Sequence, residues 1–177
     1  MKTTQILIAG FGGQGVLFAG KFLAYKGLME DQQVSWLPSY GPEMRGGTAN
    51  CSIVISDTPV GSPIITTPDV LVAMNLPSLL KFVDSVVPGG QIFIDSTLID
   101  AKVERTDVKV HYIPATQIAK DAGFATLANM VLMGKVMKEC DAVRYEGSKE
   151  TLEAFIPAKK VNLIDVNCQA LQAGYDY

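Results

Sequence analysis

Short runs of apolar residues, separated by polar and glycine-containing segments, recur along the chain and predict a buried sheet. The runs predicted as strands are residues 5–9, 33–37, 50–55, 69–74, 91–95 and 108–113. Between and after them, apolar residues recur with helical spacing. The segments predicted as helices are residues 15–27, 76–86, 116–122, 126–140, 148–155 and 157–173.

Proline residues set two limits on these elements. Pro38 is expected to end the second strand, and Pro59, Pro63 and Pro68 exclude a helix between residues 57 and 68. The remaining alternation of strand and helix is typical of the α/β class. We therefore expect a single Rossmann-like domain over residues 1–177, with a mostly parallel sheet, helices on both faces and a helical C-terminal segment.

Composition and charge exclude several classes of protein. Hydrophobic residues make up 48% of the chain and the mean hydropathy is +0.22, which suits a buried parallel sheet and also a surface covered by other subunits. A net charge of −3 and a pI of about 5.1 give no basic surface for nucleic acid or an anionic membrane. No stretch resembles a membrane span or a signal peptide, so we expect a cytoplasmic protein.

The three cysteines, Cys51, Cys140 and Cys168, are far apart in the sequence. No pair has the Cys-x-x-Cys spacing of zinc, redox or iron–sulfur ligands. We expect them to be small buried residues in a reducing compartment, and we expect no metal site.

A glycine-rich loop follows the first predicted strand and precedes the first predicted helix. Gly10, Gly12 and Gly15 have the G-x-G-x-x-G spacing of dinucleotide-binding loops, in which N–H groups at the start of a helix bind phosphate. Gly12, Gly13, Gln14 and Gly15 are therefore candidate cofactor-binding residues. The long amide of Gln14 also predicts a specific hydrogen bond within the loop.

An NAD site also requires an acidic residue at the end of the second strand. Glu30 and Asp31 have about the right spacing in sequence but precede that strand, which argues against NAD. Three interpretations stay open: a phosphate site, an NAD site, and glycines that only allow the helix to pack closely on the strand.

A second loop, between the second and third predicted strands, combines an aromatic residue, an acid, an arginine and glycines. Its candidate binding residues are Tyr40, Glu43, Arg45, Gly46 and Gly47. Arg45 can bind a carboxylate or phosphate with two hydrogen bonds, and the glycines leave backbone N–H groups accessible to an anion. The same residues would suit a contact between subunits, and Glu43 and Arg45 could also form a purely local ion pair.

The sequence shows no group of residues typical of a hydrolytic or acid–base catalytic site. Asn75, at the end of a predicted strand, and Asn129, in a predicted helix, are polar residues in apolar surroundings and are added to the candidate binding residues. Asp95 is expected to act in a turn or as a helix cap, and His111 to be structural or exposed. We therefore assign no catalytic residue.

The glycine loops carry a specific resemblance to a known family. Residues 12–16 (Gly-Gly-Gln-Gly-Val) and 38–48 (Pro-Ser-Tyr-Gly-Pro-Glu-Met-Arg-Gly-Gly-Thr) resemble the gamma subunit of 2-oxoacid:ferredoxin oxidoreductases. Similar residues continue through 68–75, 88–90, 113–116, 128–131 and 167–175. The resemblance spans almost the whole chain, and within the family it is greatest to the 2-oxoglutarate type.

The resemblance implies a subunit of an enzyme complex that decarboxylates a 2-oxoacid, transfers the acyl group to coenzyme A and passes electrons to ferredoxin. It places thiamine diphosphate, magnesium and the iron–sulfur clusters on partner alpha and beta subunits, and in some members on a delta subunit. This chain would not be catalytic alone.

Our hypothesis is that the two loops line one edge of a composite site, where they bind coenzyme A or the partner chains. Pyruvate or 2-oxoisovalerate specificity in the same family is an alternative. An independent NAD(P)-dependent dehydrogenase and a nucleotide-binding scaffold module are two further alternatives.

Overall fold

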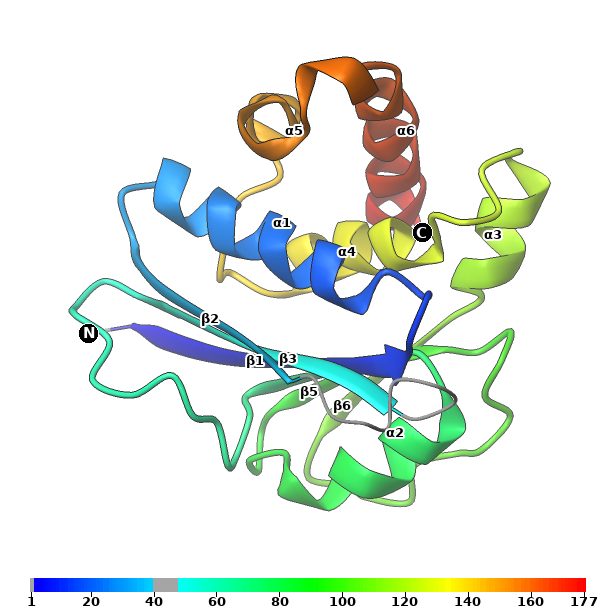
Figure 1. Cartoon of the computed structure of the whole chain (residues 1–177). Coiled ribbons are helices and arrows are strands. Elements are labelled where there is room, and N and C mark those ends of the chain that lie inside the picture. Colours follow the sequence, from blue (N-terminus) through cyan, green and yellow to red (C-terminus); the bar gives the residue numbers. More distant parts are fainter. Residues whose placement is uncertain (1, 40–47) are drawn as a thin grey trace.

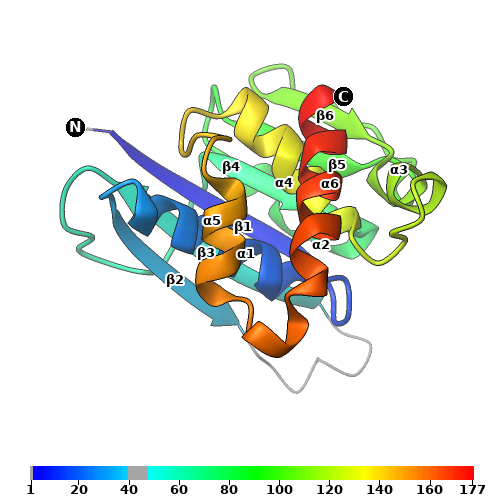
Figure 2. The same cartoon turned by 90° about the horizontal axis from the view of Figure 1, so that it is seen from above.

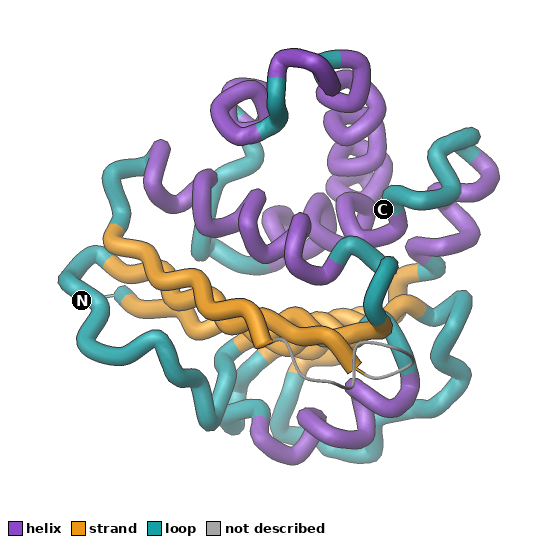
Figure 3. The backbone as a smooth tube through the Cα atoms, viewed as in Figure 1, coloured by secondary structure: helices purple, strands orange, loops and turns teal. Residues whose placement is uncertain are grey.

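The computed structural model describes residues 2–39 and 48–177. Within these residues, six strands form one sheet in the order β2-β3-β1-β4-β5-β6 (Figures 1 and 3). The strands are β1 (Thr3–Phe11), β2 (Gln33–Ser39), β3 (Thr48–Ser56), β4 (Val70–Ala73), β5 (Gln91–Asp95) and β6 (Lys109–Ile113). The helices are α1 (Val16–Met29), α2 (Leu76–Phe82), α3 (Ala115–Asp121), α4 (Ala128–Glu139), α5 (Ser148–Phe155) and α6 (Asn162–Asp176).

The sheet is mostly parallel, as the sequence predicts. β1, β4, β5 and β6 pair in parallel, whereas β3 lies between β1 and β2 and is antiparallel to both. The antiparallel strand was not predicted, because an apolar run does not reveal the direction in which a strand crosses the sheet. Its consequence is that β2 lies one strand further from β1 than in a fully parallel arrangement.

Helices cover both faces of the sheet, which confirms the predicted architecture. α1, α3 and α4 lie on one face and α2 lies on the other, while α5 and α6 form an outer layer over α1 and α4 (Figures 1 and 2). The sheet has a hydrophobic core on each face, and alternate residues of a strand point into one or the other. In β1, Ile6 and Ile8 pack on the α1 side and Leu7 packs on the α2 side. Burial on both faces explains the near-continuous apolar runs.

The boundaries of two elements differ from the prediction for identifiable reasons. β2 continues through Pro38 to Ser39, because β2 is an edge strand in which one side of the backbone needs no ladder bond. The last helix begins at Asn162 and not at residue 157, since Pro157 is followed by a separate 3₁₀ turn, Ala158–Lys160. No regular element interrupts residues 57–69, as the prolines predict.

Two glycines bring the backbones of α4 and α6 into contact. A Cβ atom added at Gly134 would lie 1.9 Å from the carbonyl oxygen of Leu171, and one added at Gly174 would lie 1.8 Å from that of Val131. Any side chain at either position would force the helices apart. This close crossing fixes the outer layer on α4.

Candidate functional site

The candidate site lies at the carboxyl ends of β1 and β4. These neighbouring parallel strands pair through Ala9 and Ala73, so their ends meet at one edge of the sheet. The chain leaves β1 toward α1 on one face, whereas it leaves β4 toward α2 on the other (Figure 1). Ligands of open α/β sheets bind at such a topological switch point.

Gln14 closes the first glycine loop with two hydrogen bonds of its side-chain amide. The N–H of Phe11 donates to Gln14 Oε1 over 2.6 Å, and Gln14 Nε2 donates to the carbonyl oxygen of Met74 over 3.0 Å. These bonds confirm the predicted specific role of the amide. They tie the loop after β1 to the end of β4.

The start of α1 keeps its backbone donors available. Gly15 is the N-cap residue in a left-handed conformation (φ +75°), no side chain caps the helix, and no acidic residue lies in the first turn. The first N–H groups of a helix have no partner within the helix and carry a partial positive charge. Gly13 (φ +93°) has no atom within 4 Å of its Cβ direction, so the backbone there is open to an approaching group. This end of α1 suits an anion.

Asn75 and Asn129 flank the loop on its two sides. Asn75 follows Met74 and caps α2, because its Oδ1 accepts from the N–H of Ser78 over 2.8 Å. Asn129, near the start of α4, donates from Nδ2 to the carbonyl oxygen of Gly15 over 3.0 Å. Both side chains are 3% exposed, and Asn75 Nδ2 and Asn129 Oδ1 have no hydrogen-bond partner within the described part of the chain. The structure therefore brings Gly12, Gly13, Gln14, Gly15, Asn75 and Asn129 to one edge of the sheet.

The candidate residues of the second loop, Tyr40, Glu43, Arg45, Gly46 and Gly47, lie outside the described residues. The residues on either side of them reach the same edge of the sheet. Ser39 ends β2 opposite Asn50, and Thr48 begins β3 opposite Phe11. The chain therefore leaves and re-enters the sheet beside the first glycine loop.

The acidic residues proposed for an NAD ribose lie at the opposite edge. Glu30 and Asp31 follow α1 and precede β2, next to the start of that strand and not its carboxyl end. The carboxylate of Glu30 already has partners within the chain, since its Oε1 accepts hydrogen bonds from Lys26 Nζ and from the N–H of Arg144. β3 further separates the end of β2 from the glycine loop. This arrangement does not match a dinucleotide site.

Asp95 and His111 have structural roles, as expected. Asp95 Oδ1 accepts from the N–H groups of Thr97 and Thr116, so it stabilises a turn and the start of α3. His111 stacks on Phe93 with ring centroids 4.4 Å apart and its Nε2 is hydrogen-bonded to Gln91. Burial lowers the pKa of His111 below its usual value, which favours the neutral ring at physiological pH.

The cysteines offer no redox or metal site in the residues that the structure covers. Cys51 and Cys140 are buried free thiols, and burial raises the pKa of each to about 12. Cys168 is a free thiol that is only half-buried, so the expected burial is wrong for this residue. Within the same residues, no three His, Cys, Asp or Glu side chains are grouped so as to hold a metal ion. No helix in the described ranges is long and apolar enough to cross a membrane.

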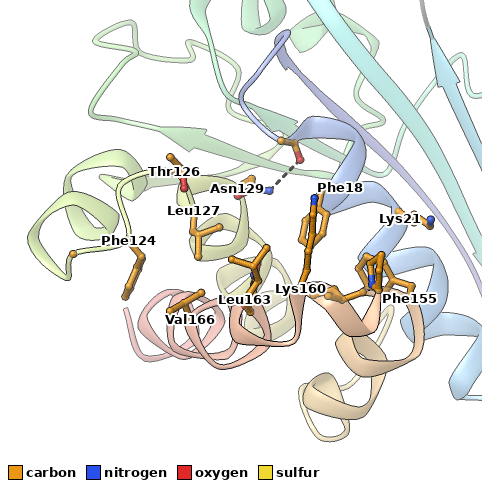
Figure 4. Close-up of a pocket in the computed structure, with 15 residues that line it drawn as sticks. Phe18, Lys21, Phe124, Thr126, Leu127, Asn129, Phe155, Lys160, Leu163 and Val166 are labelled. Carbon is orange, nitrogen blue, oxygen red and sulfur yellow. Dashed lines mark hydrogen bonds between the residues drawn. The ribbon is translucent and has the colours of Figure 1, made fainter.

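A cavity of about 660 Å³ opens beside Gly15 and Asn129, between α1, α4, α5 and α6 (Figure 4). Sequence reasoning found only these two of its lining residues. Its other walls come from residues 18–21, 123–127 and 155–167, and no local motif marks these segments. Leu163, for example, is an apolar residue of α6 that is 40% exposed, and this exposure is visible only in the folded structure.

Comparison with known proteins gives consistent relatives over the full chain. The pyruvate ferredoxin/flavodoxin oxidoreductase family matches residues 5–177. The chain is 44% identical over 174 residues to the ketoisovalerate oxidoreductase subunit VorA of Methanothermobacter thermautotrophicus, covering 98% of this chain and 36% of VorA. It is 35% identical over 181 residues to the 2-oxoglutarate synthase subunit KorC of the same organism, covering 96% of this chain and 92% of KorC.

A solved structure agrees with the described fold. The gamma subunit of a keto/oxoacid ferredoxin oxidoreductase from Geobacter sulfurreducens superposes with a TM-score of 0.81 at 26% identity, covering 98% of this chain and 96% of that subunit. The chain thus spans about a third of VorA but nearly the whole of KorC and of the Geobacter subunit. The resemblance seen in the glycine loops is confirmed: the chain belongs to the pyruvate ferredoxin/flavodoxin oxidoreductase family.

Proposed function

We propose that the chain is the gamma-type subunit of a cytoplasmic 2-oxoacid:ferredoxin oxidoreductase that forms an acyl-coenzyme A. One observation carries the proposal: the family match covers residues 5–177. The start of α1 at the switch point, which has no side-chain cap and no acidic residue in its first turn, supports it. A subunit with such a site completes an active site whose chemistry partner chains perform. Thiamine diphosphate, magnesium and iron–sulfur clusters are assigned to the alpha and beta subunits, and to a delta subunit where one is present.

The described residues fit a phosphate of coenzyme A at the start of α1. The helix has no side-chain cap, Gly13 is open, and Gln14 holds the loop in shape through Phe11 and Met74. Gly12, Gly13 and Gly15 would supply backbone N–H groups, and Arg45 of the second loop would pair with the same anion. Coenzyme A, when bound, supplies the thiol that accepts the acyl group. The residues of this chain would bind and orient it, or hold the partner chain that does so.

For the substrate we propose 2-oxoglutarate, on the pattern of residues 40–47. A branched-chain 2-oxoacid is a second candidate, favoured by the higher identity to the ketoisovalerate subunit VorA (44%) than to the 2-oxoglutarate subunit KorC (35%). Partner chains contribute to the choice of oxoacid, so a direct assay must decide between the two.

The test of the function is reconstitution. The chain is co-expressed with candidate alpha and beta chains from the same source, purified through a tag on this chain, and assayed for ferredoxin reduction with 2-oxoglutarate, 2-oxoisovalerate and pyruvate. We expect co-purification of chains that hold thiamine diphosphate and iron–sulfur clusters, and activity that depends on coenzyme A. Absence of both would refute the proposed function. Saturable binding of NAD(H) by the isolated chain would instead favour the dehydrogenase, and nucleotide binding without any partner would favour the scaffold.

The role of the loop is tested with a matched pair of variants at Gly13. Asp and Asn have similar shapes and both tolerate a positive φ, so Gly13→Asp and Gly13→Asn differ mainly in one charge next to the start of α1. We expect the KM for coenzyme A to be about five- to tenfold higher in Gly13→Asp than in Gly13→Asn, which corresponds to about 1–1.4 kcal/mol of repulsion.

Decarboxylation measured with an artificial acceptor should be unchanged in both variants. Arg45→Ala should likewise raise the coenzyme A requirement without stopping decarboxylation. If these variants instead prevent assembly, the loops are interface elements and the coenzyme A role is wrong.

A further inference from the structure

The cavity between α1, α4, α5 and α6 has the walls of a small-molecule site. It encloses about 660 Å³, within the range of about 300–1,000 Å³ that is common for ligand pockets. Figure 4 shows Phe124, Leu127, Leu163 and Val166 around one part and Phe18 and Phe155 around the other. These side chains come from α1, α5, α6 and the segment before α4. The walls are therefore built by elements that the fold holds together.

Two buried amide residues that line this cavity have acceptor oxygens without a donor in the described part of the chain. Asn129 and Asn167 both line it and are 3% and 2% exposed. Asn129 Nδ2 donates to the carbonyl oxygen of Gly15, and Asn167 Nδ2 donates to that of Leu163. A carbonyl oxygen only accepts, so these bonds fix the orientation of each amide. Oδ1 of both residues therefore remains buried without a donor in the described residues. Buried acceptors in proteins nearly always have a hydrogen-bond donor as a partner.

Within the described ranges, the two charged side chains that line the cavity are lysines. Lys21 lies on α1, with Nζ 5.6 Å from the ring centroid of Phe155, and Lys160 lies on the turn before α6. Among the described residues, no carboxylate lies within ion-pair distance of either ammonium group. Two cations beside an apolar cavity favour an anionic group on whatever enters it.

We propose that this cavity binds a small amphipathic anion: an acyl amide with an aliphatic body, an N–H donor and a carboxylate. The aliphatic body would occupy the apolar walls, the N–H group would meet the unpaired amide oxygens, and the carboxylate would lie near Lys21 and Lys160. The site is additional to the anion site proposed at Gly13 and does not depend on the oxidoreductase function.

The test is calorimetric titration of the full chain with N-decanoylglycine. Two probes each lack one feature: undecanoate has no amide N–H, and N-propyldecanamide has no charge. We expect one saturable site for N-decanoylglycine, with affinity about fivefold lower for undecanoate because an amide oxygen stays unpaired. We expect about tenfold lower affinity for the neutral amide because the lysines lose their partner.

Matched variants separate the cavity from non-specific binding. Replacing both lysines, Lys21→Gln with Lys160→Gln, should weaken N-decanoylglycine about tenfold and leave N-propyldecanamide unchanged. Lys159→Gln, next to Lys160 but not lining the cavity, should have no effect. Leu163→Trp should fill the cavity and abolish binding, whereas Leu28→Trp, also at an exposed position but outside the cavity, should not.

Three results would overturn the proposal. The first is the absence of saturable binding of N-decanoylglycine by the unmodified chain. The second is binding that Leu163→Trp and the double lysine variant leave unchanged. The third is binding to the isolated chain that disappears in the reconstituted complex, which would make the cavity a contact for a partner segment. The first two results come from titrations of this chain alone. They would therefore stand even if the proposed oxidoreductase function were wrong.

Discussion

Replacing Gly15 with alanine should destabilise the chain through a contact that spans 114 residues of sequence. A Cβ atom at Gly15 would lie 2.4 Å from Asn129 Nδ2 and 2.9 Å from Asn129 Cγ. The buried Asn129 side chain would have to move and break its hydrogen bond to the Gly15 carbonyl oxygen. The left-handed φ of +75° adds backbone strain.

The expected loss in the free energy of unfolding combines two costs and one smaller offset. An L-residue in the left-handed region costs about 1–2 kcal/mol, and displacing a buried hydrogen-bonded amide costs about 1–3 kcal/mol. The smaller entropy of the unfolded alanine chain offsets about 0.4–1 kcal/mol. Gly13→Ala is the matched control, because φ there is +93° but no atom lies within 4 Å of the added Cβ. Strain and entropy are common to both variants, so Gly15→Ala should be about 1–3 kcal/mol less stable than Gly13→Ala.

Urea denaturation followed by circular dichroism measures these free energies of unfolding. The contact is isolated by a double-mutant cycle with Asn129→Ala, which removes the clash. The Gly15 carbonyl oxygen still accepts from the N–H of Ala19 in that background, so Asn129→Ala alone should cost only about 1 kcal/mol. In the Asn129→Ala background, Gly15→Ala should cost no more than Gly13→Ala.

Two results would refute this reasoning. One is equal destabilisation by Gly15→Ala and Gly13→Ala in the unmodified chain. The other is a coupling energy between Gly15→Ala and Asn129→Ala below about 0.5 kcal/mol, the usual error of additivity. Either would mean that the loop moves away from α4 at little cost.

Three further predictions concern charged and thiol groups. Lys26→Met should lower the free energy of unfolding by about 3 kcal/mol or more in urea titrations, because Lys26 and Glu30 pair with only 4% and 8% of their side chains exposed; a loss below about 1 kcal/mol would contradict this. Lys109 and Lys135 hold the pKa of Glu139 at about 2, below its usual 4.5, so its contribution to stability is present above pH 4.5 and falls as the pH drops toward 2; Glu139→Gln should flatten this dependence in acid titrations followed by circular dichroism. Thiol labelling at pH 8 should modify the half-buried Cys168 well before Cys51, whose pKa burial raises to about 12, and mass spectrometry showing Cys51 labelled first would contradict this.

Much of the fold was predictable because the sheet is buried on both faces. β4 is apolar throughout and β5 is apolar at its three central positions, and this makes both strands visible in the sequence. The glycine loop was also visible, since a loop between a strand and a helix has a fixed place at the carboxyl end of the sheet.

The antiparallel course of β3 and the partners of Asn129 were not predictable from local patterns. Strand direction depends on the path of the whole chain, and the bond from Asn129 to Gly15 depends on how α4 packs beside α1. The cavity escaped prediction for the same reason. Its walls come from four helices that are far apart in the sequence, and no local motif in any of them marks a cavity.

The glycine-mediated contact between α4 and α6 makes completion of the cavity depend on the order of synthesis. α6 follows every other described element in the chain, so it leaves the ribosome after α4. Until α6 docks against Gly134, the cavity lacks the wall that carries Leu163, Val166 and Asn167. A nascent chain would therefore expose the apolar surface of α4 to chaperones, and the cavity would be complete only when α6 is in place.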